Sequence, residues 1–323
     1  KAVGAEGILQ AEVLSFRRMA YRVFNEVGGL TRPHINPAGK CMLLHRIMED
    51  MKDELKIFSG AIRQHGFART VSDIITEFKR YNVSPELLSS TIEKLKDDDI
   101  LKNKLEEISK IFSEFDERLH VRYTDLDDDL TELVKKLDKS LQFNGAEIWI
   151  DEFSGFTPQE YCVIEKLLQK TRRINISLCV DCIDDCENTD STNVFSPVLS
   201  TAARLKKIAN DIGVNIESPI RVPVDVSCPG RFAKSKELKH LERYFFTFPY
   251  SRYNEETKDV KVVAASNIYS EVESAARDII SLCRDRGMRY RDIAVVSRNL
   301  DEYESFVSAI FTDYGIPYFI DKK

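Results

Sequence analysis

The chain has 323 residues, of which 43% are hydrophobic and 31% are charged, and its formal net charge is −6 at pH 7. This length is sufficient for two domains, and the composition is that of a soluble globular protein. No apolar run approaches the roughly 20 residues that span a bilayer. The negative net charge argues against a nonspecific DNA coat with a basic face, while a local basic site is compatible with it.

The seven cysteines are odd in number and scattered, which is typical of reduced thiols in the cytoplasm. One cluster, CVDCIDDC, holds Cys179, Cys182 and Cys186. A CxxC pair can ligate zinc, but a second pair or neighbouring histidines are missing from this stretch. We therefore expect no metal site at these cysteines, and a cytoplasmic protein.

The predicted elements begin with a short strand over Ala11–Phe16, AEVLSF. A helix follows over Arg18–Val27 and ends at the glycine pair Gly28-Gly29. The segment His34–Lys40, HINPAGK, has the composition of a loop. One βα unit therefore opens the chain.

From Cys41 to Leu141 the pattern is helical almost throughout, and turn signals near Asn82–Pro85 and Asp97–Asp99 divide it. Apolar residues recur at three- and four-residue spacing, most clearly at Leu101, Leu105, Ile108, Ile111 and Phe112. We interpret this stretch as a helical insert between two βα units. A generic helical bundle would give the same pattern.

The most informative stretch is AEIWIDEFSGFTPQE, residues 146–160. Its apolar, β-prone run Ile148–Ile150 ends in two adjacent carboxylates, Asp151 and Glu152. A buried strand with acidic residues at its C-terminal edge is how P-loop NTPases present the Asp that holds magnesium, and the second carboxylate would polarise the attacking water. An ordinary βα unit with an acidic loop has the same pattern, and these residues alone do not separate the two.

A helix start follows this strand directly. Thr157 is the expected N-cap, Pro158 takes the first helical position and Glu160 closes a capping box. The elements expected next are a helix to about Gln169, a strand over Ile174–Val180 and a helix over about Val198–Ile212.

The stretch Val222–Pro229 is the expected domain boundary. Beyond it strands and helices alternate again, and the capping box Ser270-x-x-Glu273 predicts the start of an amphipathic helix with one apolar face. Such alternation indicates parallel sheets covered on both faces, so the expected fold class is α/β. The expected strands are Val260–Ala265, Ile293–Ser297 and Pro317–Ile320.

Four segments carry a resemblance to a known family, namely Val13–Gly29, Ile148–Leu168, Arg231–Phe246 and Tyr269–Asn299. In this order they resemble the N-terminal, helicase-like part of the B subunit of AddAB/RexAB helicase–nucleases, which process double-strand DNA ends in bacteria. The resemblance covers nearly the whole chain and is most specific at DEFSGFTPQEY and from SEVESAARDI to YGIPYFID. The latter block is also similar to the second motor domain of UvrD-like superfamily 1 helicases.

The resemblance implies RecA-like parallel sheets of the P-loop NTPase and superfamily 1 helicase type, with an inserted all-helical subdomain. The first RecA-like domain would comprise residues 1–33 and 142–225, the helical, 1B-like insert residues 34–141, and the start of the second RecA-like domain residues 226–323. Lys1 in place of Met predicts that the chain is a piece of a longer protein. The iron–sulfur cluster of the family is expected only in a C-terminal nuclease region outside this chain.

An NTPase of this class needs a phosphate-binding loop, a magnesium carboxylate, a water-positioning group and an arginine. The sequence has no GxxxxGK[ST], so the phosphate-binding loop is absent from it. The resemblance implies that Asp151 would hold magnesium, that Glu152 would position the attacking water and that Arg231 would contact the nucleotide. The family commonly has Gly at the position of Glu152, so Glu152 makes this site look less degenerate than usual. Ser154 and Gly155, however, stand where the UvrD-like pattern DEFQD has Gln and Asp. We therefore expect a vestigial motor: Mg²⁺ and ATP belong to the full-length protein, and this chain alone should not hydrolyse ATP. The alternative is an active superfamily 1 DNA helicase motor truncated of its phosphate loop.

The segment FRRMAY mixes aromatic and guanidinium groups, which suits single-stranded DNA because rings stack on bases and Arg reads guanine edges or pairs with phosphates. In the family the matching positions help to read the Chi recombination sequence. The resemblance implies this role for Phe16, Arg18 and Tyr21, with Phe153 or Phe156 as a further stacking surface. Without the resemblance, burial of Phe16 and Tyr21 against the sheet is the favoured interpretation.

We therefore expect part of the B subunit of an ATP-dependent helicase/deoxyribonuclease that processes double-strand DNA ends for recombinational repair. The expected partners are single-stranded, Chi-containing DNA and the A subunit, with which it would form a heterodimer. A membrane is not an expected partner.

Overall fold

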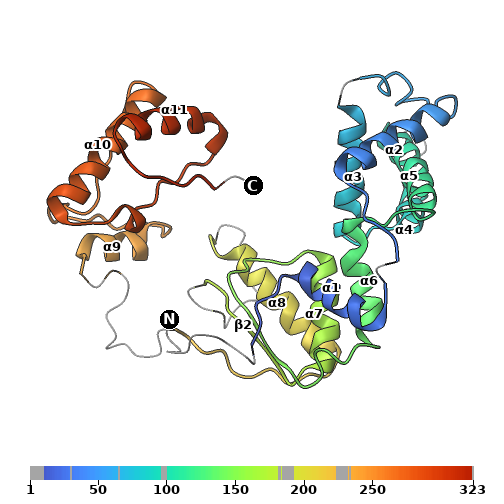
Figure 1. Ribbon diagram of the computed structural model, residues 1–323. Coiled ribbons are helices and arrows are strands. Elements are labelled where there is room, and N and C mark those ends of the chain that lie inside the picture. The colour runs from blue at the N-terminus through green and yellow to red at the C-terminus, as the bar shows by residue number, and fades with distance from the viewer. Residues whose placement is uncertain are drawn as a thin grey trace. The chain divides into compact units, whose positions relative to one another are not determined.

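The computed structural model describes residues 11–29, 31–64, 66–95, 100–180, 183, 193–222, 232 and 234–321. The chain divides into two compact units, Lys1–Arg221 and Val222–Lys323, and each is described by itself. Helices dominate both units (Figure 1). None of the helices in the described part of the chain is long and apolar enough to cross a membrane.

The first unit contains a small parallel sheet flanked by helices. Its elements outside the insert are α1 (Phe16–Val27), α6 (Asp129–Leu137), β1 (Glu147–Ile150), α7 (Pro158–Lys170), β2 (Arg173–Ile176) and α8 (Ser196–Asp211). The two strands are parallel, with Ile148 opposite Ile174, and both side chains lie against the core that α1, α6 and α7 share. That core is closed by Ala20, Val23, Leu133, Leu137, Val163 and Leu167. The expected α/β class is therefore present, with helices in the majority.

The start of α7 confirms the predicted capping box. The Thr157 hydroxyl accepts a hydrogen bond from the backbone N–H of Glu160 at 3.3 Å, and the Glu160 carboxylate accepts one from the backbone N–H of Thr157 at 2.7 Å. Pro158 takes the first helical position, where a backbone N–H would have no intrahelical partner. These local contacts fix the end of the loop that carries residues 151–156.

Between α1 and α6 the chain forms a helical insert with its own core. The insert contains α2 (Pro37–Asp50), α3 (Phe67–Arg80), α4 (Pro85–Ile92), α5 (Ile100–Leu119) and the short 3-10 helix η1 (Leu126–Asp128). Its core is closed by Leu44, Ile47, Ile75, Ile111, Phe112 and Phe115. Asn82, at φ +57°, forms the turn predicted near Asn82–Pro85. The turn predicted at Asp97–Asp99 lies outside the described residues.

The two ends of the insert are tied together by backbone hydrogen bonds. Ile35 N donates to Thr124 O at 2.9 Å, and Thr124 N donates to Pro33 O at 3.1 Å, which makes a parallel bridge between His34 and Thr124. The chain therefore enters and leaves the insert at one place, close to the start of α6.

The strand predicted over Ala11–Phe16 is wrong for the described residues. Residues 11–15 form no strand, and α1 begins at Phe16, two residues before the predicted start. Ser15 gives the reason, because its hydroxyl accepts a hydrogen bond from Arg18 N at 3.3 Å and so caps the helix early. Strand β2 also ends at Ile176, short of the predicted Val180. The described sheet therefore has two strands, and a RecA-like sheet stays a prediction.

The second unit is built on two long helices that pack against each other. Its elements are α9 (Lys236–Tyr244), α10 (Ile268–Arg286), the 3-10 helix η2 (Tyr290–Asp292) and α11 (Leu300–Asp313). Val272, Ala276 and Ile279 bury the predicted apolar face of α10 against Ile310 and Phe311 of α11. The predicted capping box at Ser270 is wrong in position: the helix begins earlier because its N-cap is Asn267, whose side chain accepts from Ser270 N at 2.8 Å.

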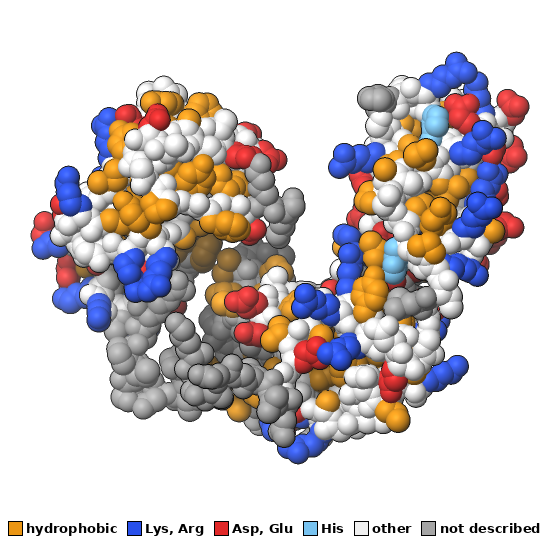
Figure 2. Space-filling view, in the orientation of Figure 1, with side chains coloured by type: hydrophobic (Ala, Val, Ile, Leu, Met, Phe, Trp, Pro, Cys, Tyr) orange, Lys and Arg blue, Asp and Glu red, His pale blue; other side chains and the backbone are white. Residues whose placement is uncertain are grey.

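The three strands predicted in this unit are also wrong for the described residues, because the segments Val260–Ala265, Ile293–Ser297 and Pro317–Ile320 form no ladder. Their side chains are covered on one side only, through contacts such as those of Ile293 and Ile320 with the α10–α11 core. Parallel strands need cover on both faces. Val262, Val296 and Phe319 are instead 93%, 90% and 88% exposed, and Figure 2 shows hydrophobic side chains gathered on one face of this unit.

Candidate nucleic-acid interface

Helix α1 has one buried face and one face that carries cations. Met19, Ala20, Val23 and Phe24 point into the core of the first unit. Side chains three and four residues apart share a helix face, so Arg17, Arg18 and Tyr21 lie together on the exposed side. Arg22 pairs with Glu12. Neither Arg17 nor Arg18 forms an ion pair with a described residue, so both guanidinium groups are available to an anion.

Three phenylalanines form an aromatic cluster beside the start of α1. The rings of Phe153 and Phe156, in the loop after β1, are stacked with centroids 5.1 Å apart. Phe16 meets both rings edge-on, at 5.9 and 6.4 Å. Phe153 is 36% exposed, while Phe16 and Phe156 are half-buried. The aromatic cluster (Phe16, Phe153 and Phe156) therefore has a fixed shape and keeps ring surface open to solvent.

A second aromatic residue of α1, Tyr21, contacts the insert. Its hydroxyl lies 3.5 Å from Nδ1 of His34, and Nε2 of the same imidazole lies 2.9 Å from Oδ1 of Asp129. With the proton on Nε2, the imidazole donates to Asp129 and accepts from the Tyr21 hydroxyl. The other carboxylate oxygen of Asp129 is buried and accepts no hydrogen bond from the described residues. This chain of contacts holds the Tyr21 ring at the junction of α1 and the insert.

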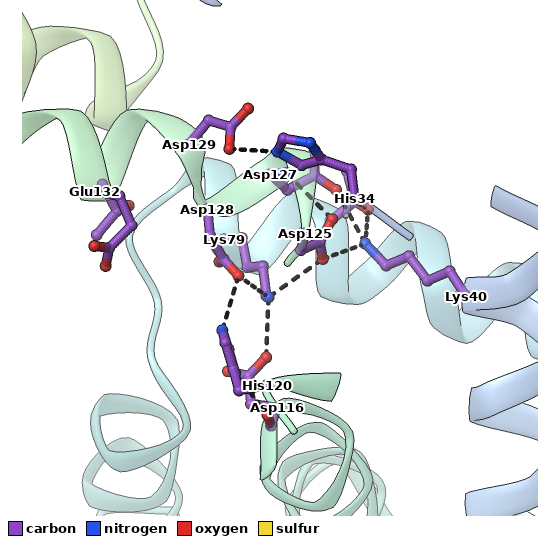
Figure 3. A network of polar contacts seen from close by, with 12 residues as sticks. His34, Lys40, Lys79, Asp116, His120, Asp125, Asp127, Asp128, Asp129 and Glu132 are labelled. Atoms are coloured by element: carbon purple, nitrogen blue, oxygen red, sulfur yellow. Dashed lines mark hydrogen bonds and ion pairs between the residues drawn. The ribbon is translucent and has the colours of Figure 1, made fainter. Parts of the chain in front are cut away.

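Two buried lysines fix the segment that carries Asp129 (Figure 3). Lys40 of α2 and Lys79 of α3 are each only 6% exposed. Lys79 pairs with Asp116, Asp125 and Asp128 at 2.9, 3.3 and 2.9 Å, and Lys40 with Asp125 and Asp127 at 2.9 and 3.0 Å. The acidic run before α6 is thereby tied to the helices of the insert, which positions His34 and Asp129 against Tyr21.

The pKa values of these carboxyl groups are shifted in different directions, depending on burial and on neighbouring cations. Burial works against the charged form of Asp125, but Lys79 and Lys40 outweigh it and lower the pKa of that carboxyl. Burial raises the pKa of Asp116, and the opposing effect of Lys79 offsets this rise only in part. Burial also raises the pKa of Asp129, partly offset by its hydrogen bond to His34. On acidification Asp116 and Asp129 therefore take up protons before Asp125.

The predicted magnesium and water residues lie directly after β1. Asp151 is exposed and accepts a hydrogen bond from the Ser177 hydroxyl. Glu152 has φ +65°, in the left-handed region that favours glycine. No group of three metal-ligating side chains occurs in the described part of the chain, and the sequence contains no GxxxxGK[ST]. The residues present therefore do not fit a magnesium–nucleotide site by themselves.

The structure brings some of the predicted DNA-binding residues together and separates others. Phe16 lies with Phe153 and Phe156. Tyr21, five residues further along a helix with about 3.6 residues per turn, faces His34 instead. Arg18 is exposed on the Tyr21 side of the helix. The five residues thus form two separate patches, one around Phe16 with the loop after β1 and one around Arg18 and Tyr21 on the exposed side of α1.

Some predicted residues lie outside the described part of the chain, namely Arg231, Cys182 and Cys186. Cys179 is an exposed free thiol.

Sequence reasoning missed His34, Asp129 and the two buried lysines. Their partners are distant in sequence, since His34 and Asp129 are 95 positions apart, so no local period could reveal them. The signal that was present is the run DLDDDL, residues 125–130. Four aspartates so close together in an amphipathic helical region need cations nearby, and those cations are Lys40 and Lys79.

Comparison with known proteins agrees with the resemblance seen in the sequence. The family model described as "ADDB, N-terminal" matches residues 1–242. The B subunit of the ATP-dependent helicase/deoxyribonuclease of Clostridium botulinum (strain Loch Maree / Type A3) is 52% identical over 314 residues, which are 97% of this chain and 27% of that protein. The B subunit of the same name from Acetivibrio thermocellus is 49% identical over 321 residues, 99% of this chain and 28% of the relative. The chain thus spans little more than a quarter of the length of these relatives.

Proposed function

Since this chain belongs to the family of AddB N-terminal regions, we propose that it is the DNA-binding, helicase-like part of the B subunit of an ATP-dependent helicase/deoxyribonuclease. Such an enzyme would process double-strand DNA ends for recombinational repair together with an A subunit as partner. The proposed role of this region is to hold one DNA strand on the exposed face of α1.

The observation that carries the proposal is the aromatic cluster beside the available arginines of α1. Base–aromatic stacking is worth about 1–3 kcal/mol per base, and Phe153 offers an open ring for it. Arg17 and Arg18 are exposed and form no ion pair with a described residue, so they can pair with phosphates without breaking a protein contact. In a chain of net charge −6, such a local cationic face is where an anionic strand would bind.

Recognition of Chi follows as the finer part of the proposal. A guanidinium can donate two hydrogen bonds to one guanine edge, which discriminates against a wrong base by about 1–3 kcal/mol. We assign this reading role to Arg18, with stacking by Phe16 and Tyr21. In the assembled complex, Arg18→Ala should then reduce Chi-dependent attenuation of nuclease activity more than it reduces binding to DNA ends.

The second candidate, an active motor, has less support. Asp151 already accepts a hydrogen bond from Ser177, and Glu152 sits in a strained backbone conformation. A Mg²⁺–ATP site would need residues that this sequence does not contain, so ATP and magnesium are proposed only for the full-length protein. The iron–sulfur cluster is likewise proposed for its nuclease region alone.

Fluorescence anisotropy with a labelled oligonucleotide of about 20 nucleotides, longer than the roughly 4–16 that single-strand modules cover, tests the proposal. Arg18→Ala and Phe153→Ala should each weaken binding about tenfold, as expected for one lost phosphate or stacking contact. The matched control is Arg69→Ala on α3, which removes the same charge at an exposed position without an ion pair to a described residue. Equal affinities for the three variants and the unaltered chain would contradict the proposed site.

A further inference from the structure

A hollow lies at the base of the insert, where the chain enters and leaves it. Its volume is about 530 Å³, and one wall is the segment from His34 to the second turn of α2. The other wall is the end of α5 with the turn Val121–Tyr123. The backbone bridge between His34 and Thr124 ties the two walls together, so the hollow is formed before any ligand binds. Its size falls within the roughly 300–1,000 Å³ of small-ligand sites.

The side chains of this hollow suit a nucleotide. Tyr123 is 41% exposed and Met42 is 74% exposed, which gives an open aromatic and apolar lining. Arg122 is exposed and forms no side-chain hydrogen bond or ion pair with a described residue. Arg118 is held in place by Asp50 and Glu114. None of the described residues that line the hollow is acidic, although the whole chain is negatively charged.

His34 connects the hollow to the exposed face of α1. His34 lines it and at the same time contacts the Tyr21 hydroxyl at 3.5 Å. Tyr21 in turn shares its helix face with Arg17 and Arg18. A strand that leaves the arginines of α1 over Tyr21 therefore reaches the hollow by crossing His34.

We infer that this hollow binds a nucleotide of the same DNA strand, with the base stacked on Tyr123 and a phosphate paired with Arg122. The inference rests on the proposed function, because the occupant is the strand held by α1. It extends the DNA contact from α1 onto the helical insert and gives His34 the role of a positioning residue between the two. An aromatic face beside a free guanidinium is the combination that single-strand binding proteins use.

The test is a salt titration of oligonucleotide binding by the whole chain and its variants. Arg122→Ala should weaken binding about tenfold and make the slope of log K against log salt less negative by about 0.7, the value of one single-strand phosphate contact. Tyr123→Ala should weaken binding about fivefold or more, while Tyr123→Phe keeps the ring and most of the affinity. Arg69→Ala again serves as the control, and its slope should be unchanged.

The outcomes separate this inference from the proposed function. If Arg18→Ala weakens binding but Arg122→Ala and Tyr123→Ala match the unaltered chain in affinity and slope, the inference is overturned and the proposed function stands. If the unaltered chain binds no single-stranded DNA, both are overturned. A Tyr123→Phe variant as weak as Tyr123→Ala would also contradict stacking. Far-UV circular dichroism of each variant shows whether the fold is kept.

Discussion

Replacement of Lys79 by Met should destabilise the insert more than any surface substitution. The Lys79 side chain is 5% exposed and its ammonium lies within 3.3 Å of three carboxylates. Removal of one partner of a buried ion pair typically costs about 3–5 kcal/mol, because the other charge stays buried without compensation. Here Asp125 keeps Lys40, and Asp128 keeps His120 at 3.6 Å. Asp116 then carries the largest free-energy penalty. We therefore expect Lys79→Met to lower the free energy of unfolding by about 3 kcal/mol at neutral pH.

The loss should depend on pH. In the variant, Asp116 and Asp125 lose the cation that favours their charged forms, so their folded-state pKa values rise. A carboxyl group whose pKa is higher in the folded than in the unfolded state destabilises the fold at pH values above that folded-state pKa. The destabilisation disappears as the pH falls and the group takes up a proton. The difference between the unaltered chain and Lys79→Met should therefore shrink as the pH falls from neutrality towards about 4.

Urea unfolding followed by far-UV circular dichroism, with hydrogen exchange of α3 and α5 to localise the effect, measures this loss. The control is Lys135→Met, which removes an exposed lysine paired with Glu132 at 2.7 Å and should cost less than about 1 kcal/mol. A loss below about 1 kcal/mol for Lys79→Met, or a loss that is the same at every pH, would show that Lys79 does not compensate the buried carboxylates.

Three further predictions concern local features. The pKa of His120 is raised, mainly by its hydrogen bond to Asp128, so its stabilising contribution is complete below about pH 6.5 and is lost as the pH rises through the folded pKa. The loss of stability in His120→Gln, measured by urea titration, should therefore be larger at acidic than at alkaline pH. Equal losses at the two pH values would contradict this. Glu152→Gly should stabilise the chain by about 0.5–1 kcal/mol, since relief of the left-handed strain at φ +65° exceeds the added entropy of glycine in the unfolded chain. A destabilised variant would show that the contacts of the Glu152 side chain contribute more free energy than the backbone strain costs. Thr157→Ala should cost about 0.5–2 kcal/mol through loss of the capping box of α7, whereas Thr157→Ser should keep most of the stability, and thermal unfolding of the pair checks this.

The features that sequence predicted correctly are those with local causes. The start of α7 was predictable because Thr157, Pro158 and Glu160 act within one turn. The apolar face of α10 was predictable because Val272, Ala276 and Ile279 recur at helical spacing. The early starts of α1 and α10 were missed because Ser15 and Asn267 are better placed caps than the residues that the patterns favoured.

The missed features depend on partners that are distant in sequence. A strand exists only where a second strand accepts its hydrogen bonds, so the apolar runs around Val13, Val262 and Val296 could be recognised as β-prone without forming strands. The contact of Tyr21 with His34 and Asp129 joins three segments through tertiary packing, and no periodicity of the sequence contains it. The aromatic cluster was predicted in part: the resemblance implied a stacking role for Phe16, with Phe153 or Phe156 as a further surface, and the structure shows that Phe16 contacts both rings.

The most direct test of strand binding by α1 is photo-crosslinking of the chain to single-stranded DNA that carries 4-thiothymidine, followed by identification of the crosslinked peptides. We expect crosslinks at Phe16 and Tyr21 on α1 and at Phe153 or Phe156 in the loop after β1. Unlabelled single-stranded DNA should compete for them. Crosslinks confined to peptides of residues 234–321, with none on α1, would contradict the claim that this helix face holds the strand.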